Sequence, residues 1–323
     1  MTGVNSSNES ERRQRRIFYL SKHFGHPLGG VRIAYHHVAV LNRHGFDAAM
    51  LLVDGMKDNF FDTNVPVARL SPEHVIRPTD IYVIPEPWKY CLQRFAEFPV
   101  RRLVFCQNHF YLYHGLEDRW SFDDYGVHQV FCCSEVIAQY LQDIFDLKDV
   151  PIIHNGIDHD VFRPAPAKKR QIAYMPRKMK VESIFIRETF RRRHPQYADV
   201  PWVQITNRTE AQVGGILGES AVFMALGRIE GFGLPPLEAM ASGCIVVGFT
   251  GDGGRSYATA ENGLWCTPED WMGTADALAQ ALGDFDRDGG RCWVEAGRVT
   301  ADQYTLDRME REIVAFWEAE VRR

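Results

Sequence analysis

Short apolar runs alternate with amphipathic segments along almost the whole chain. In the first half, nearly continuous apolar runs predict strands at residues 17–20, 48–53, 81–84, 103–106 and 129–132. Such runs are typical of strands that are buried on both faces of a parallel sheet. In the segments between them, apolar residues recur at spacings of three and four, which predicts amphipathic helices at 31–44 and 134–145.

The second half of the chain repeats this alternation. We expect strands at 172–175, 202–205, 221–224 and 244–248, and helices at 182–193, 209–219, 236–242, 272–282 and 301–321. Strands and helices that alternate in this way predict two doubly wound α/β domains, each with a parallel sheet. In such sheets ligands bind at the carboxyl ends of the strands, so we expect the two domains to face a cleft that holds the site.

Domain boundaries follow from length and from one interruption of the pattern. A chain of 323 residues is too long for one ordinary domain, and prolines and lysines break the alternation between residues 151 and 169. We therefore expect a disordered tail at 1–15, an N-terminal doubly wound domain at 16–160, a C-terminal doubly wound domain at 161–305, and a C-terminal helix at 306–323 that can cross back to the first domain.

Composition narrows the class of protein. Hydrophobic residues make up 45% and charged residues 24%, as in ordinary globular proteins. The formal net charge of −5 gives no bulk attraction to nucleic acid, and we interpret the basic run at 11–16 as a solvated tail. Seven cysteines, several inside apolar runs and none at zinc-ligand spacing, favour a reduced, cytoplasmic protein. No apolar stretch is long enough to span a bilayer, although peripheral membrane contact stays open.

The segment Glu230-Gly-Phe-Gly-Leu-Pro-Pro-Leu-Glu238 carries the clearest chemistry. Its glycines let the backbone approach a ligand closely, and its prolines suit the first turn of a helix. Amides at a helix N-terminus suit a phosphate. Ionised carboxylates accept hydrogen bonds, so one glutamate can hold a sugar and the other a ribose. A helix start rich in acidic residues would explain the glutamates but not the glycines, and the segment therefore predicts a sugar-nucleotide site.

Residues 230–243 resemble the Glu-x7-Glu signature of family-4 (group 1) retaining glycosyltransferases, which have the GT-B fold. Three further segments are similar to the glycine loops and the interdomain segment of that family: 28–31, 154–158 and 250–254. The likeness covers most of residues 17–323 and is more specific in the C-terminal half. It implies a GT-B α/β fold made of two Rossmann-like doubly wound domains.

The resemblance also implies roles within the signature. Glu230 is expected to position the donor sugar, and Glu238 to hold the ribose. The backbone amides that assist belong to Gly231, Phe232, Gly233 and Leu234.

A departing diphosphate needs positive charge. Arg177 and Lys178 directly follow the strand predicted at 172–175, at the end where ligands bind. The family places an arginine and a lysine there against the diphosphate. Arg177 matches that pattern well, whereas the family's lysine usually lies further on, so Lys178 and Lys180 compete for its role.

Further candidates lie in the first domain. Gly29 and Gly30 precede a predicted helix and resemble glycines whose backbone approaches the donor phosphates. His109 follows a strand end where related enzymes have a histidine that touches the donor sugar. His23 and His26 lie in a loop that can serve either the acceptor or the fold.

Together these features predict a retaining hexosyltransferase that moves a sugar from a nucleoside-diphosphate sugar, UDP or GDP, to an acceptor hydroxyl. No metal site and no cofactor are expected, because no Asp-x-Asp pattern follows a strand and the resemblance implies a metal-independent enzyme. The acceptor stays open among a glycan, a lipid-linked glycan, a protein and a small metabolite. Two alternatives remain: an epimerase or phosphorylase on the same scaffold, and a non-catalytic sugar-nucleotide-binding partner protein.

Overall fold

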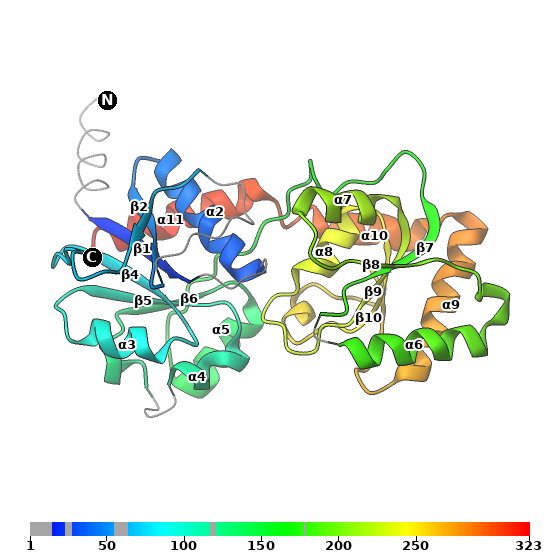
Figure 1. Cartoon of the computed structure of the whole chain (residues 1–323), viewed down its shortest axis with the longest axis horizontal. Coiled ribbons are helices and arrows are strands. Elements are labelled where there is room, and N and C mark those ends of the chain that lie inside the picture. Colours follow the sequence, from blue (N-terminus) through cyan, green and yellow to red (C-terminus); the bar gives the residue numbers. More distant parts are fainter. Residues whose placement is uncertain (1–14, 23–27, 55–63, 117–120, 178) are drawn as a thin grey trace. The chain divides into compact units, whose positions relative to one another are not determined.

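The computed structural model describes residues 15–22, 28–54, 64–116, 121–177 and 179–323 (Figure 1). Contacts between residues divide the chain into two compact units. Unit 1 comprises the described residues up to His154 together with Asp307–Arg323, and unit 2 comprises Asn155–Leu306. The C-terminal segment therefore belongs to the unit that also contains the N-terminal strands.

Unit 1 is built on a six-stranded parallel sheet of order β3-β2-β1-β4-β5-β6. Its strands are β1 (Arg16–Ser21), β2 (Asp47–Leu52), β3 (Val67–Arg69), β4 (Ile81–Pro85), β5 (Arg101–Cys106) and β6 (Gln129–Cys132). Its helices are α2 (Gly29–Arg43), α3 (Lys89–Ala96), α4 (Leu112–Gly115), α5 (Glu135–Phe145) and α11 (Leu306–Glu320), with short 3-10 turns at η1 (His109–Tyr111) and η2 (Asp123–Tyr125).

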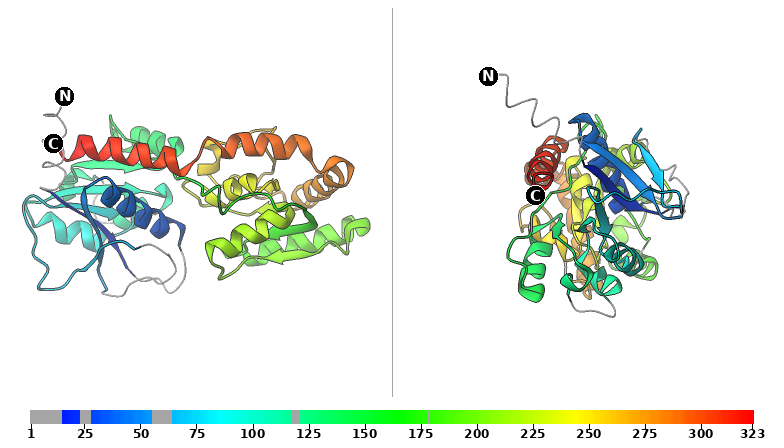
Figure 2. Two further views of the ribbon diagram at one scale, coloured as in Figure 1. Left: turned by 90° about the horizontal axis from the view of Figure 1, so that it is seen from above. Right: turned by 90° about the vertical axis from the view of Figure 1, so that its left-hand side faces the viewer.

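Alternate side chains of β1 show which helices cover each face of this sheet. The Tyr19 ring contacts His37 of α2 and Trp317 of α11, at 5.6 and 6.1 Å between centroids. Phe18 points to the other face and stacks on Tyr82, whose ring contacts α3. Helices α2 and α11 therefore cover one face and α3 the other, as Figures 1 and 2 show. The sheet is buried on both sides, as its continuous apolar strands predicted.

Unit 2 is built on a five-stranded parallel sheet of order β11-β10-β9-β7-β8. Its strands are β7 (Lys169–Tyr174), β8 (Trp202–Gln204), β9 (Ser220–Ala225), β10 (Ile245–Gly248) and β11 (Leu264–Trp265). Its helices are α6 (Lys180–Arg193), α7 (Glu210–Glu219), α8 (Leu234–Ala241), α9 (Trp271–Asp288) and α10 (Arg291–Ala301), with 3-10 turns at η3 (Pro195–Tyr197) and η4 (Gly253–Ser256).

Helices cover both faces of the unit 2 sheet. The core on one face joins side chains of β7, β9 and β10 to α6 and α9, with Ile172, Phe190, Val222 and Leu278 almost fully buried. Helices α7, α8 and α10 lie on the other side (Figure 1). Two parallel sheets, each between helix layers, are the α/β architecture that the alternating sequence pattern predicted.

The C-terminal helix expected at 306–323 is observed as α11, which begins at Leu306. The longer bounds of 301–321 were wrong at their start, and α10, which ends at Ala301, was not predicted. Between the two helices the backbone turns toward Ile157, whose N–H donates to the carbonyl oxygen of Tyr304 at 2.8 Å and which pairs with Thr305 in a β-bridge. In a continuous helix these backbone groups would form hydrogen bonds within the helix. The spacing of apolar residues does not predict a long-range pairing of this kind.

Helix α11 is held in unit 1 by both packing and charge. Trp317 is fully buried, and its indole N–H donates to the Tyr19 hydroxyl at 3.1 Å. Arg101 forms a 2.6 Å ion pair with Glu320, whose side chain is buried. A sequence segment at the end of the chain thus completes the core of the first sheet.

The described residues can also be examined for disulfides, membrane-spanning helices and metal-ligand groups. All seven cysteines are free thiols, and five of them are buried. None of the helices in the described ranges is both long and apolar enough to cross a membrane. Within these same ranges, no group of three or more His, Cys, Asp or Glu side chains is placed to hold a metal ion.

Candidate functional site

The topology of unit 2 places Arg177 and Glu230 at one edge of its sheet. β7 and β9 are parallel neighbours, while β8 lies beyond β7 and β10 beyond β9. The strand order therefore reverses between β7 and β9, and in open α/β sheets ligands bind at the carboxyl ends of strands at such a point. Arg177 follows β7 and Glu230 follows β9. Tertiary structure thus unites two residues that lie far apart in the sequence.

Arg177 is available to an anionic ligand. Its side chain is exposed in the turn between β7 and α6, and it makes no ion pair with a residue in the described part of the chain. Lys178, the predicted partner of Arg177, lies outside the described residues. Lys180, its competitor, is the first residue of α6 and is exposed.

The turn before α8 depends on a glycine. Gly233 adopts a left-handed conformation with φ of 86°, which a residue with a Cβ rarely adopts. The Tyr257 hydroxyl donates to the Gly233 carbonyl oxygen at 2.6 Å and fixes the turn. Pro235 and Pro236 have no N–H, so these two residues at the start of α8 cannot donate to an anion.

A second glycine loop interlocks with this turn. The N–H of Gly253, in η4, donates to the carbonyl oxygen of Glu230 at 2.8 Å. A Cβ on Gly253 would lie 2.1 Å from the carbonyl oxygen of Gly231, which is too close for any side chain. The loop at 250–254 therefore supports the turn at 231–234 through direct backbone contact, and its glycines are a packing requirement.

Glu230 and Glu238 flank the turn, and both affect the pKa of Tyr257. Glu230 is half-buried, and Glu238 lies in α8 with 5% of its surface exposed. Burial, together with the nearby Tyr304, Glu230 and Glu238, raises the pKa of Tyr257 well above its usual value. Because the charges of both carboxylates raise the pKa of this one hydroxyl group, the two ends of the predicted motif both lie near Tyr257.

Sequence reasoning missed the aromatic residues that hold this region together. The rings of Phe232, Tyr257 and Tyr304 pack against one another with centroids 5.5 to 6.1 Å apart. All three side chains are buried. Tyr304 comes from the turn between α10 and α11, and Tyr257 follows η4, so no local pattern connects them to Phe232.

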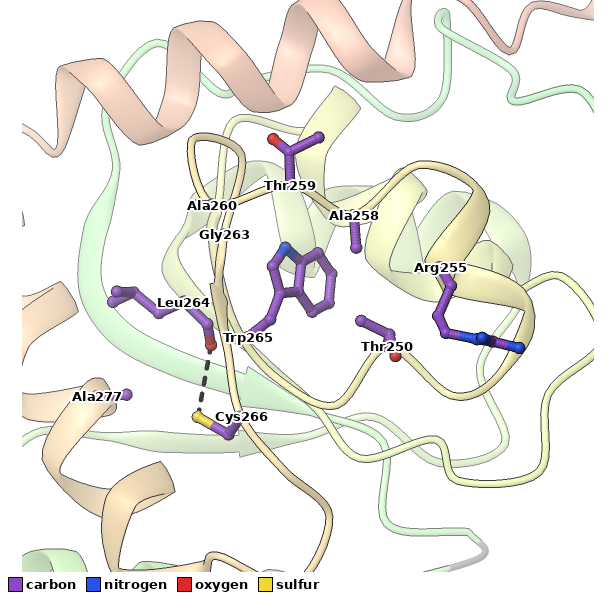
Figure 3. A pocket seen from close by; sticks show the side chains of 10 residues that line it. All are labelled: Thr250, Arg255, Ala258, Thr259, Ala260, Gly263, Leu264, Trp265, Cys266 and Ala277. Atoms are coloured by element: carbon purple, nitrogen blue, oxygen red, sulfur yellow. Dashed lines mark hydrogen bonds between the residues drawn. The ribbon is translucent and has the colours of Figure 1, made fainter. Parts of the chain in front are cut away.

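A pocket of about 500 Å³ opens beside the second glycine loop. Figure 3 shows the indole of Trp265 in the middle of its lining, with Thr250 and Thr259 nearby and the Arg255 side chain extending away. The Trp265 N–H donates to Asn262, which in turn donates to the Tyr257 carbonyl oxygen at 2.7 Å. The pocket is therefore coupled to the predicted site through the backbone of residue 257, although none of the predicted site residues is among its described lining.

The predicted residues of unit 1 lie at the carboxyl end of its own sheet. Gly29 and Gly30 begin α2, after β1. The Gly30 carbonyl oxygen accepts a 3.1 Å hydrogen bond from the Gln107 amide, which lies so close that a Cβ on Gly30 would meet it at 3.1 Å. His109, two residues beyond Gln107, is 4% exposed, and its ring packs against Phe110 and Tyr140. His23 and His26 lie outside the described residues.

Glu86 is a buried carboxyl group at this same edge that the sequence did not indicate. It follows β4 and is 5% exposed. Burial raises its pKa to about 7, even though backbone hydrogen bonds from Gln107 and Asn108 favour the ionised form. Glu86 therefore holds the loop that leads to His109 and titrates near neutral pH.

Comparison with known proteins adds to this geometry. Residues 186–284 match the family model described as glycosyl transferases group 1. Over 300 residues the chain is 27% identical to the alpha-1,6-glucosyltransferase of Actinobacillus pleuropneumoniae serotype 7 (strain AP76), and the match covers 88% of this chain and 89% of that protein.

Solved structures share the fold of the whole chain. Sucrose-phosphate synthase of Thermosynechococcus elongatus has a TM-score of 0.70, and the match covers 94% of this chain and 98% of that one. Anabaena HepE in complex with UDP-glucose has a TM-score of 0.71 and coverages of 94% and 99%. A glycosyltransferase of Rickettsia africae ESF-5 has a TM-score of 0.66 and coverages of 95% and 98%. Each is 14% identical to this chain, so these likenesses concern the fold.

The residues that match the family model lie in unit 2 and include the predicted donor motif. The matched residues 186–284 include β9, the glycine turn and α8, which carry the predicted donor motif. The two parallel sheets match those of GT-B glycosyltransferase structures along nearly the full chain. Residues 186–284 are therefore a group 1 glycosyl transferase domain, and the chain has the GT-B fold.

Proposed function

We propose that this glycosyltransferase moves a hexose from a UDP- or GDP-sugar to an acceptor hydroxyl with retention of anomeric configuration. The observation that carries the proposal is the turn between β9 and α8, where backbone amides, glycines and two glutamates gather around Tyr257. Amides suit a diphosphate and carboxylates suit sugar hydroxyls, so one short segment offers both kinds of contact.

Each residue of unit 2 has a distinct role in this proposal. Glu230 positions the donor sugar, with help from the amides of residues 231–234. Glu238 holds the ribose hydroxyls. Arg177, with Lys178 or Lys180, stabilises the negative charge that grows on the departing diphosphate. In unit 1, Gly29, Gly30 and His109 are proposed to serve the phosphates and the sugar of the same donor.

Catalysis then rests on positioning and electrostatics. The acceptor hydroxyl attacks the anomeric carbon from the face that the diphosphate leaves, and the leaving phosphate oxygen receives the hydroxyl proton. The C–O bond to the phosphate breaks as the new glycosidic bond forms, so retention needs no protein nucleophile. Arg177 and the backbone amides supply the positive charge in this scheme, and we propose that no metal ion is required.

UDP-glucose is the first donor to test. One relative is named an alpha-1,6-glucosyltransferase, and one structural neighbour was solved with UDP-glucose. A bound ligand raises the melting temperature by mass action, so a thermal-shift screen of UDP, GDP, ADP and dTDP sugars identifies the donor. Release of the nucleotide then measures turnover, and the anomeric configuration of the product, measured by NMR, tests retention.

A Glu238→Gln change tests the ribose contact. It removes one charge-assisted hydrogen-bond acceptor, so we expect the Kd for the nucleotide to rise by about 10- to 100-fold. Glu261→Gln, at an exposed position of the same unit, is the control and should leave the Kd unchanged. Equal affinity of the Glu238 variant and the unaltered enzyme, measured by calorimetry, would remove Glu238 from the proposed site.

A further inference from the structure

An exposed aromatic surface lies on unit 1, outside the residues assigned to the donor motif. Phe110 and Tyr113 are 41% and 44% exposed, which is unusual for such large rings. Tyr140 lies beside them and is half-buried. We call these three side chains the aromatic surface. Large exposed apolar groups that cluster, as opposed to single ones, mark binding sites.

Two neighbouring strand connections build this surface. Phe110 and Tyr113 lie in η1 and α4, after β5, and Tyr140 lies in α5, after β6. Because β5 and β6 are adjacent and parallel, the connections that follow them lie side by side. The Tyr113 and Tyr140 hydroxyl oxygens are 2.9 Å apart and hydrogen-bonded, which fixes the two rings relative to each other.

The surface is continuous with the predicted site residue His109. The His109 ring lies 4.3 Å from that of Phe110 and 4.9 Å from that of Tyr140, measured between centroids. His109 itself is nearly fully covered, so these neighbours present the outer face of the cluster to solvent. Asn108 holds the start of η1 by accepting a hydrogen bond from the Phe110 N–H at 3.2 Å.

The chemistry of this surface suits a saccharide. Its two exposed rings offer flat apolar faces that match the C–H faces of a pyranose, and its paired hydroxyls can exchange hydrogen bonds with sugar hydroxyls. Burial and the hydrogen bond to Tyr113 raise the pKa of Tyr140 to about 12, so the Tyr140 hydroxyl stays neutral at physiological pH. A neutral surface of rings and hydroxyls is poorly matched to an anionic polymer.

We propose that the aromatic surface is the subsite for the acceptor, and that the acceptor is a saccharide whose pyranose ring stacks on Phe110 and Tyr113. The inference rests on the proposed transferase activity, because only a transferase needs an acceptor. It narrows the acceptor class to a carbohydrate and assigns the residues that recognise it.

The test separates acceptor binding from donor use. With UDP-glucose as the donor and methyl α-glucoside, isomaltose and cellobiose as acceptors, we expect the double variant Phe110→Ala/Tyr113→Ala to raise the acceptor KM at least tenfold. Its donor KM and its acceptor-free release of UDP should change much less than the acceptor KM. Tyr113→Phe keeps the ring and removes the hydroxyl, so we expect only about a threefold rise in acceptor KM. Phe185→Ala removes an exposed ring from unit 2 and should change neither constant.

The outcomes differ for the two proposals. If the unaltered enzyme neither binds nor hydrolyses any sugar nucleotide, the proposed function fails. If donor hydrolysis persists but none of the saccharides is extended, or the double variant keeps the acceptor KM, the acceptor proposal is wrong. Co-sedimentation with phosphatidylglycerol vesicles that depends on Phe110 and Tyr113, without saccharide transfer, would assign this surface to a membrane instead.

Discussion

Arg177 shows how a single exposed residue acquires a role from its position. Arg177 is exposed where the chain leaves β7, which pairs with the strand that leads into the glycine turn. Nothing in its exposure alone distinguishes it from Arg192, which is also exposed in unit 2. The difference is the edge of the sheet on which Arg177 lies, because ligands of parallel sheets bind there.

We expect Arg177→Ala to lower kcat by about 100-fold and to change the Kd of the donor much less, because charge on the diphosphate grows toward the transition state. Stopped assays of nucleotide release, with donor binding measured separately, give both constants. Arg192→Ala is the matched control and should retain normal turnover. Normal turnover by the Arg177 variant as well would show that its assigned role is wrong.

Glu86 predicts a pH dependence of stability. Its pKa is about 7 in the folded state, against 4.5 in its unperturbed state. The folded protein therefore holds this proton more tightly than the unfolded chain does. The stabilisation is fully present below pH 4.5 and is lost as the pH rises through 7, and it amounts to at most about 3 kcal/mol.

Glu86→Gln keeps the shape of the side chain and removes its titration. We expect the difference in unfolding free energy between pH 5 and pH 8 to shrink in this variant, which should be more stable than the unaltered protein at pH 8. Urea denaturation at both pH values measures this. Glu97→Gln, at an exposed position, should keep the original difference. An identical pH dependence with and without the Glu86 carboxyl would contradict the account.

At the scale of elements, α11 illustrates how a distant segment completes a core. Its Trp317 fills the space beside Tyr19 of β1, and its Glu320 pairs with Arg101 of β5. Partly buried ion pairs of this kind fix position more than they add stability. The packing of Trp317 is therefore the larger contribution to holding α11 on the sheet.

We expect Trp317→Ala to destabilise unit 1 by about 3–5 kcal/mol, because truncation of a buried tryptophan leaves a cavity. Chemical denaturation followed by circular dichroism measures the loss, and Val299→Ala, at an exposed helix position, is the control. Nucleotide binding by the variant should persist below its unfolding transition, since the donor motif lies in unit 2. A change in stability below about 1 kcal/mol would show that α11 contributes little to the core.

At the scale of the whole molecule, the chain consists of two units of the same architecture that differ in their chemistry. Unit 2 carries the glycine turn, the two glutamates and Arg177, whereas unit 1 carries Glu86, His109 and an aromatic surface. We therefore propose a division of labour in which unit 2 recognises the nucleotide and unit 1 recognises the acceptor.

Hydrogen exchange tests this division. Saturating UDP should slow amide exchange in residues 226–238 and 250–257, where the two glycine loops lie, because a bound ligand suppresses local opening. The outer strands β2 and β3 of unit 1 should exchange at unchanged rates. Protection that appears only in unit 1 would reverse the proposed assignment of the nucleotide.

Strands and helices were the most predictable part of the fold. The run 129–132 coincides with β6, because its last three residues are apolar and buried, as in a strand that is covered on both faces. The helix predicted at 209–219 is observed at Glu210–Glu219, and Thr209 caps it with a capping box. The pairing that shapes the segment between α10 and α11 was not predictable, because the β-bridge of Thr305 joins it to Ile157, far away in the sequence.

By itself, the sequence determined that this chain forms parallel α/β layers, and it predicted that the glycines and carboxylates of residues 230–238 serve a sugar nucleotide. The spacing of hydrophobic residues and the residue types of a motif are local properties, so they can be read directly from neighbouring positions in the sequence. Only the tertiary structure decided the order of the strands, which puts Arg177 and Glu230 after neighbouring strands, and the contact of Tyr257 with Gly233. It alone also brought Phe110, Tyr113 and Tyr140 together and buried Glu86. These features arise from contacts between remote segments, which form because burial of apolar surface favours one compact arrangement of the whole chain.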